Sequence, residues 1–153
     1  MRALELKVPP VVQFAFCAAA GYGLSRAVPA LAFRLPGTTV AAGLLALAGA
    51  GIGAAGVILF VRLRTTVNPH RPENASAVVA SGVYRLTRNP MYLGLLLALA
   101  AWSLYLSNAA AALALPAFVA YMNRFQIEPE ERALTSKFGA PFIAYMAAVR
   151  RWC

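Results

Sequence analysis

Two short polar groups stand out in a chain that is otherwise largely apolar. The first is a run that leads directly into an apolar segment, Ser81-Gly82-Val83-Tyr84-Arg85-Leu86-Thr87-Arg88-Asn89-Pro90-Met91-Tyr92. The second comes later and is acidic, Glu128-Pro129-Glu130-Glu131. Polar residues are costly beside lipid and usually serve a function there. We therefore expect the two groups to bind a polar ligand between them.

The dipeptide Asn89-Pro90 predicts the start of a helix. Asn is a favoured N-cap residue, and Pro suits the first helical position. The backbone N–H groups of Met91 and Tyr92 would then point out of the helix start, beside Arg88. Free donors and the positive end of the helix dipole together favour an anion at this place.

Aromatic and acidic side chains extend the possible chemistry. Tyr84 offers a ring face to a flat group or a cation. Glu130 and Glu131 can accept hydrogen bonds from an ammonium group or from ribose hydroxyls. S-adenosylmethionine carries a carboxylate, an ammonium, a sulfonium and an adenosine, so it would use all of these features. The residues alone allow a second interpretation, in which Arg88 binds lipid phosphate and Asn89 only caps a helix.

The composition is that of a membrane protein. The chain has 153 residues, of which 61% are hydrophobic and 12% are charged. A fold of this size cannot bury so much apolar surface in its own core. The net charge of +9 fits an anionic membrane surface. Nucleic acid is not an expected partner, because the basic residues are scattered between apolar segments.

Four apolar segments predict the architecture: Val8–Val28, Thr39–Leu63, Met91–Leu106 and Ala109–Phe125. The first two reach the ~20 residues that a helix needs to cross the hydrocarbon core, whereas the last two are shorter. Ser107-Asn108 predicts a tight hairpin between the last two segments. We expect an all-α, polytopic membrane helical bundle of about four transmembrane helices; three crossings and a re-entrant hairpin are the alternative.

Charge placement predicts the topology. With four crossings, all of the 14 Lys and Arg residues except Arg26 and Arg34 fall on one side, and so do all of the acids. The positive-inside rule then places both termini and the central loop in the cytoplasm. We expect an integral, multi-pass protein of the bacterial cytoplasmic membrane. It would be one domain over residues 1–153, with an N-terminal helical pair in 1–64 and a cofactor-binding region in 65–153.

The second apolar segment is rich in glycine. Gly49 and Gly53 form a small-xxx-small pair that lets another helix approach closely. Packing within the chain and a homodimer through this segment are both open. His70 has no second His and no Cys pair nearby in the sequence, so a metal site is not expected. Cys17 and Cys153 are expected to be free thiols.

The C-terminal part predicts two short helices. Pro129 suits the first position of a new helix, with acidic residues in its first turn. Gly139 is placed to end that helix and Pro141 to begin another. A Trp beside arginines, as in Arg150-Arg151-Trp152, is typical of the headgroup level. We expect a broken amphipathic element on the cytoplasmic face.

Taken together and in order, these motifs resemble a known family. They are Ser81-Gly82-Val83-Tyr84, Arg88-Asn89-Pro90-Met91-Tyr92, Glu130-Glu131, Phe138-Gly139, Tyr145 and Val149-Arg150-Arg151-Trp152. They resemble the isoprenylcysteine carboxyl methyltransferase family, and related integral-membrane phospholipid methyltransferases look similar in this region. The resemblance covers about residues 65–152.

The resemblance implies a methyltransferase that is built from membrane helices and depends on S-adenosylmethionine. It implies cofactor contacts at Val79, Tyr84, Asn89, Pro90, Tyr92 and Glu130. Many eukaryotic members have His where this chain has Asn89. The arginine that binds substrate in such members has no clear counterpart, since Gln126 occupies its place and Arg124 lies two residues earlier. A prenylcysteine carboxylate is therefore not the expected acceptor.

The expected reaction is in-line transfer of a methyl group to a lipophilic or membrane-associated acceptor, which could be a carboxylate, an amine or a thiol. Such a reaction mainly needs positioning and exclusion of water. Arg88 or Arg124 could orient an anionic acceptor. The alternatives are a small four-span transporter and a scaffold protein without catalytic activity. Proton-coupled transport usually needs an ionisable residue inside the membrane, and no acid lies within the four segments.

Overall fold

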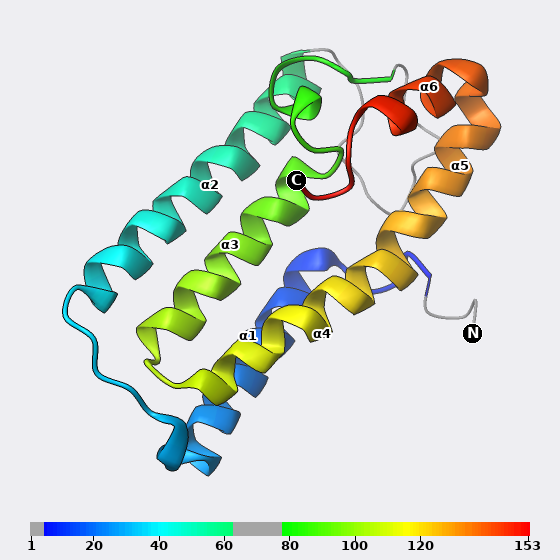
Figure 1. The fold of residues 1–153 in the computed structure, drawn as a ribbon. Coiled ribbons are helices and arrows are strands. Elements are labelled where there is room, and N and C mark those ends of the chain that lie inside the picture. Colours follow the sequence, from blue (N-terminus) through cyan, green and yellow to red (C-terminus); the bar gives the residue numbers. More distant parts are fainter. Residues whose placement is uncertain (1–4, 63–77) are drawn as a thin grey trace.

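The computed structural model describes residues 5–62 and 78–153. Their helical elements are, in order, α1 (Pro10–Ala27), η2 (Pro29–Leu31), α2 (Thr38–Arg62), η4 (Gly82–Arg85), α3 (Pro90–Tyr105), η5 (Ala109–Leu113), α4 (Ala114–Tyr121), the π-helical η6 (Met122–Ile127), α5 (Glu128–Phe138) and α6 (Ala140–Ala148) (Figure 1). These residues form no β-strand, only an isolated bridge between Ala32 and Asn108. The all-α prediction is confirmed. His70 lies outside the described residues.

The four apolar segments are all helical, but they do not all meet the requirements for a membrane span. Within the described residues, only α2 is both long enough and apolar enough to cross a bilayer. Helix α3 is apolar but shorter, with 16 residues. Four crossings therefore remain a prediction. Helix α3 ends at Tyr105, shortly before the turn at Ser107, where φ is +51°, and α4 is bounded by η5 and η6.

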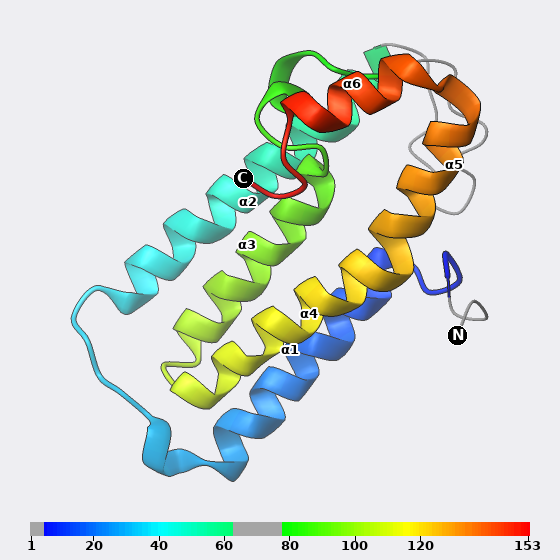
Figure 2. The same cartoon turned by 45° about the vertical axis from the view of Figure 1, so that its right-hand side comes forward.

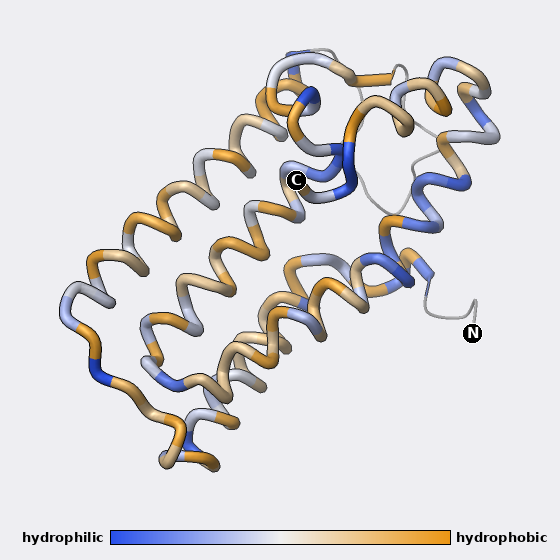
Figure 3. Tube along the Cα trace, viewed as in Figure 1, coloured by the Kyte–Doolittle hydropathy of each residue, from blue (hydrophilic) through white to orange (hydrophobic). Residues whose placement is uncertain are grey.

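Polar and apolar residues separate along the long axis of the bundle. Helices α1 to α4 run alongside one another, and both described chain ends lie toward the same end of the bundle (Figures 1 and 2). Helix α5 and the C-terminal segment at that end carry most of the hydrophilic residues (Figure 3). Opposite them lie the turns between α1 and α2 and between α3 and α4. The sequence therefore directs its polar groups to one end.

Glycines let α2 and α3 approach each other very closely. A Cβ placed on Gly49 would lie 2.7 Å from the carbonyl oxygen of Gly94, and one on Gly94 would lie 2.6 Å from that of Gly49. A Cβ placed on Gly56 would likewise lie 3.1 Å from the ring of Pro90. The glycine stripe thus serves packing within the chain. Gly43 meets nothing within 4 Å, and a homodimer through α2 stays a prediction.

A small core joins α1, α3, α4 and η6. Leu99, Phe118 and Met122 are fully buried there and pack with Cys17 of α1. Asn108 fixes the hairpin that the sequence predicted: its Oδ1 accepts from the N–H of Ala110 over 2.9 Å. Its Nδ2 donates to the carbonyls of Ser25 and Val28 over 3.2 and 2.9 Å. One buried side chain therefore holds the end of α1 against the hairpin.

Helix α5 begins at Glu128 with Pro129 in its first turn, as predicted, but no break precedes it, because α4, η6 and α5 run on continuously. Ile127 and Glu128 both have helical dihedral angles. Proline has no N–H and would leave the carbonyl four residues earlier without a partner. That carbonyl, on Phe125, instead accepts from the N–H of Leu6 over 3.0 Å. The N-terminal segment thus replaces the bond that Pro129 cannot make.

The boundary between the last two helices is confirmed. Gly139 has φ +60° and follows the last residue of α5. Pro141 lies in the first turn of α6. A positive φ is readily adopted only by glycine, and the turn directs α6 back over the polar end, as Figure 2 shows.

Substitutions in α2 test the close helix packing. We expect Gly49→Ala to lower the free energy of unfolding by about 1–3 kcal/mol, because its Cβ would collide with backbone of α3. Gly43→Ala is the matched control: its Cβ meets open space, and helix propensity alone favours it by up to about 1 kcal/mol. Thermal unfolding in detergent measures both. Equal melting temperatures for the two variants would contradict this packing.

Candidate functional site

The polar residues of the two sequence groups meet at the polar end of the bundle. Turn η4, the start of α3, the end of η6, helix α5 and the C-terminal segment converge there (Figure 2). The site described below is built around the side chain of Glu130, which is the second carboxylate of helix α5. We call it the Glu130 site.

Glu130 is bound by two uncharged donors from neighbouring elements. The hydroxyl of Tyr92 donates to its Oε1 over 2.5 Å. The amide Nε2 of Gln126 donates to the same oxygen over 2.7 Å and lies 3.4 Å from the Tyr92 hydroxyl. Tyr92 and Gln126 are both buried, with 7% and 1% of their surface exposed. The three side chains are thus joined to one another by hydrogen bonds.

Burial raises the pKa of Glu130 to about 7. The hydrogen bonds from Tyr92 and Gln126 oppose that shift, and the charge of Glu131 adds to it. Within 5–62 and 78–153, no Lys or Arg lies within 4 Å of this carboxylate, whereas Glu5, Glu128 and Glu131 all have arginine partners. Glu130 is therefore a partly buried carboxylate without a cation among the described residues.

Two tyrosines cover the site from η4 and α6. Tyr84 is 4% exposed and packs against Phe60, with ring centroids 5.2 Å apart. Tyr145 donates its hydroxyl to the carbonyl of Tyr84 over 2.8 Å. Burial raises the pKa of Tyr145 to about 12, and the nearby charge of Arg88 opposes the shift. Burial also raises the pKa of Tyr84, so both phenols stay protonated near pH 7 and can donate hydrogen bonds.

Glu131 points to the other side of α5 and is paired twice. Arg151 donates through Nε and Nη2 to its two oxygens, over 3.0 and 2.6 Å. Arg88 lies 3.3 Å from the first of these oxygens. Adjacent residues on a helix point about 100° apart, so Glu131 takes the arginines while Glu130 faces Tyr92. Bidentate pairs of this kind are strong and geometrically specific.

Two buried polar atoms beside these side chains have no hydrogen-bond partner in the described part of the chain. They are the hydroxyl oxygen of Tyr84 and the Nε of Arg88. Buried polar groups in native proteins are normally hydrogen-bonded. An acceptor from a ligand could bind each of them.

Asn89 occupies the N-cap position of α3, but its side chain does not cap the helix, so the capping interpretation is wrong. Its Nδ2 instead donates to the carbonyl of Arg151 over 3.0 Å, and Thr87 donates to the same oxygen over 3.0 Å. The N–H of Arg88 donates to the carbonyl of Arg150 over 2.9 Å. The C-terminal segment therefore lies against the start of α3. Pro90 stands at the first helical position, as predicted.

The remaining predicted residues lie at different distances from this centre. Val79 is buried, with 6% exposed. Arg88 belongs to the site through Glu131. Arg124 does not: it donates to Glu5 over 2.9 Å, is 40% exposed, and reaches the arginine network only through Glu128 at 3.9 Å. Of the two arginines expected to orient an acceptor, the structure brings only Arg88 to the site.

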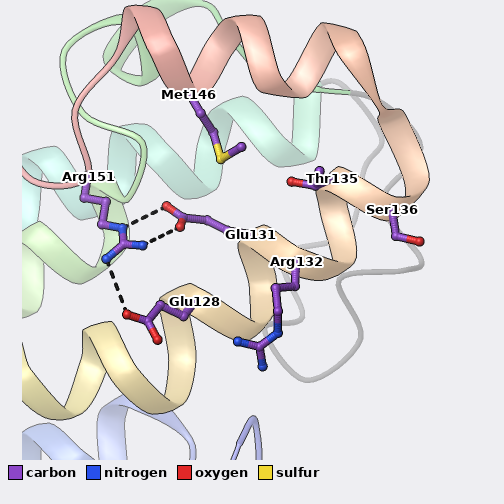
Figure 4. A pocket seen from close by; sticks show the side chains of 7 residues that line it. All are labelled: Glu128, Glu131, Arg132, Thr135, Ser136, Met146 and Arg151. Carbon is purple, nitrogen blue, oxygen red and sulfur yellow. Dashed lines mark hydrogen bonds and ion pairs between the residues drawn. The ribbon is translucent and has the colours of Figure 1, made fainter.

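A hollow of about 580 Å³ opens between α5 and α6 on the Glu131 side of the helix. Figure 4 shows its lining, which is Glu128, Glu131, Arg132, Thr135, Ser136, Met146 and Arg151. None of the six residues expected to contact a cofactor lines it. The Arg151–Glu131 pair lies in the lining of this hollow.

Several residues of the site could not be assigned from the sequence. Thr87 acts through a hydrogen bond to the C-terminal segment, and Gln126 acts through bonds to Glu130 along its helix and to Tyr92 of α3. Arg151 looked like a headgroup anchor, yet its guanidinium binds Glu131. A signal for Gln126 did exist, since a residue four positions before Glu130 shares its helical face.

Comparisons with known proteins agree with the motif pattern. A family model described as "Phospholipid methyltransferase" matches residues 38–141, which is more than half of the chain. An "Uncharacterized protein" of Haemophilus influenzae is 50% identical over 62 residues, covering 40% of this chain and 98% of that protein. No solved structure matches the chain.

Substitution of Arg151 tests the ion pairs that hold the C-terminal segment. Arg151→Ala should lower the free energy of unfolding by about 1–3 kcal/mol, because it leaves Glu131 with Arg88 alone. Arg150→Ala is the control, since the Arg150 side chain is exposed and, among the described residues, hydrogen-bonds only to the carbonyl of Cys153. Thermal unfolding measures both variants. A loss of stability in Arg151→Ala as small as that in Arg150→Ala would show that the Arg151–Glu131 pair contributes nothing.

Proposed function

Because the chain belongs to the phospholipid methyltransferase family, we propose that it transfers a methyl group from S-adenosylmethionine to a lipophilic or membrane-associated acceptor. The observation that carries the proposal is the partly buried Glu130 carboxylate without a cation among the described residues. An unpaired buried charge is costly, and a cationic ligand would compensate it. The Glu130 site therefore favours a ligand with a positive group.

The donors of the site fit the rest of this cofactor. Arg88 Nε and the Tyr84 hydroxyl are buried and need acceptors, and a carboxylate and ribose or adenine atoms supply acceptors. The Glu130 carboxylate needs a donor or a cation, which an ammonium or a sulfonium provides. This agreement between the protein's donors and acceptors and the ligand's groups supports S-adenosylmethionine, the usual cofactor of the family. Of the residues that the resemblance implies, Tyr84, Tyr92 and Glu130 form the centre of the proposed site, with Val79, Asn89 and Pro90 around it.

Each residue of the site has a task in the proposed reaction. When bound, the cofactor supplies an activated methyl group, so the protein needs to position the reactants and to exclude water. Glu130 would hold the cationic part, and Arg88 would orient an anionic part. Tyr84 and Tyr145 exclude water from the side of η4 and α6. The described residues hold the carboxylate in place before a ligand arrives, which lowers the cost of binding.

The apolar surface supports a membrane location for this chemistry. On α2, Val40, Leu44 and Leu47 are 66%, 63% and 71% exposed. An exposed apolar face of this size marks contact with lipid or with a partner. We propose a multi-pass protein of the bacterial cytoplasmic membrane with both termini in the cytoplasm. The acceptor would then reach the site from the bilayer and the cofactor from the cytoplasm.

Direct binding tests the cofactor. Purified protein should bind S-adenosylmethionine or S-adenosylhomocysteine in the micromolar range, about −8 kcal/mol or weaker. Glu130→Gln should weaken binding of S-adenosylmethionine roughly ten- to a hundredfold, which corresponds to about 1.5–3 kcal/mol for hydrogen bonds to a charged group.

The control for this experiment is Glu128→Gln on the same helix. Glu128 is 39% exposed and lies 3.8 Å or more from its arginines, so its loss should change the affinity by less than about threefold. Folded wild-type protein that gives no heat and no thermal shift at millimolar ligand would disprove the proposal. That result would leave a transporter or a scaffold as the better candidate.

The acceptor is tested by methyl transfer with labelled cofactor. At the place of the family's substrate arginine this chain has Gln126, which cannot bind a carboxylate through two charged hydrogen bonds. We expect methylation of an amine, thiol, phenol or lipid headgroup in a membrane lipid extract or among small thiols. A prenylcysteine analogue is the comparison. Turnover on that analogue alone, abolished when its carboxylate is removed, would contradict this expectation.

A further inference from the structure

Gln126 is the only described residue that donates to Glu130 from the same helix. Its side chain is 1% exposed, and its Nε2 reaches Oε1 of Glu130 over 2.7 Å. The second donor, the Tyr92 hydroxyl, binds the same oxygen over 2.5 Å. Both hydrogen bonds therefore converge on Oε1. No donor among the described residues reaches Oε2, which remains for a ligand.

The helix geometry explains how Gln126 comes to face Glu130. Gln126 lies in the π-helical segment η6, and Glu130 follows four residues later in α5. Phe125, beside Gln126, is fixed by the bond from the Leu6 N–H to its carbonyl. Asn123, in the same segment, faces elsewhere and accepts from the indole of Trp152 over 3.0 Å. Segment η6 thus gives its two amide side chains different partners.

The titratable groups around Glu130 lie on four elements. The charge of Glu131 on α5 raises the pKa of Glu130, and the hydrogen bond from Tyr92 on α3 lowers it. Tyr84 of η4 also interacts with the carboxylate electrostatically, and Tyr145 of α6 acts on Tyr84. Apart from Glu131, these neighbours are neutral near pH 7. Gln126 adds a donor without adding a charge, so it orients the carboxylate and leaves its negative charge to a ligand.

We propose that Gln126 is a positioning residue: it binds Oε1 of Glu130, directs Oε2 into the site, and sets the pH at which that carboxylate becomes available to a cationic ligand. The ligand part of this inference rests on the proposed function. The effect of Gln126 on the pKa of Glu130 does not rest on that function, because this pKa is a property of the protein without a ligand.

The carboxylate can be observed directly. The five acidic residues of the chain are all Glu, so the carboxyl carbons of ¹³C-labelled glutamate give few NMR signals, and Glu130→Gln assigns the one of interest. In the wild type we expect that signal to titrate with the raised pKa of Glu130, about 7. Gln126→Leu should move the midpoint up by roughly one pH unit, as expected for one lost hydrogen bond to the carboxylate.

Two further variants and a control make the test decisive. Gln126→Met removes the donor with an unbranched side chain, in case the Leu variant does not fold. Gln126→Lys should move the midpoint below that of the wild type by more than one unit, because an adjacent cation favours the carboxylate. Asn123→Leu, in the same segment, should leave the midpoint unchanged. A midpoint that stays at the wild-type value in the folded Leu, Met and Lys variants would overturn the proposal.

Binding measured on the same samples separates this inference from the proposed function. Gln126→Lys should weaken binding of S-adenosylmethionine at least tenfold, because the lysine already compensates Glu130. If the midpoints move as expected and the wild type binds no S-adenosylmethionine, the positioning role stands and the proposed function fails. If the wild type binds but the midpoints do not move, the positioning role fails alone.

Discussion

The polar end of the protein depends on one constraint: a carboxylate is partly removed from water and has no cation among the described residues. Removing a charge from water is expensive, and the usual responses are pairing or a shift in pKa. Glu130 shows the second response, with its pKa raised to about 7. Its neighbour Glu131 shows the first, with Arg151 and Arg88 as partners. Two adjacent glutamates thus differ in their surroundings: Glu131 is paired with two arginines, and Glu130 has no cation among the described residues.

The surrounding structure keeps that carboxylate in place by joining segments that are far apart in the sequence. The N-terminal segment binds the carbonyl of Phe125 next to Gln126. The C-terminal segment binds Thr87 and Asn89 through the carbonyl of Arg151. The contact of Gly49 with Gly94 brings the backbones of α2 and α3 against each other. Close packing of this kind limits how far the start of α3, and with it Tyr92, can move.

Local rules predicted the features that depend on few residues. The apolar segments gave the places of the helices, and Ser107-Asn108 marked the hairpin that Asn108 indeed fixes. Gly139 and Pro141 marked the boundary between α5 and α6, because a positive φ and a missing N–H constrain the chain directly.

The predictions that failed depend on partners distant in the sequence. Pro129 lies in the first turn of α5 as predicted, but the unbroken passage from η6 into α5, where Leu6 binds the carbonyl of Phe125, was not foreseen. Asn89 does not cap α3, because the carbonyl of Arg151 takes its amide. The role of Gln126 likewise requires knowing that Tyr92 binds the same oxygen of Glu130. No local pattern shows these long-range contacts, although the four-residue spacing does place Gln126 and Glu130 on one helical face. The types of residue that could do chemistry were visible from the start.

The most direct test of this account counts protons. A cation bound to Glu130 favours the deprotonated carboxylate, so binding must release the proton that a raised pKa retains. At pH 6.5, with a pKa of about 7, roughly three quarters of a proton should leave per molecule bound. Titration calorimetry with S-adenosylmethionine in buffers of different ionisation enthalpy measures this number, which should fall to about zero in Glu130→Gln. Binding without proton release in the wild type would contradict the account.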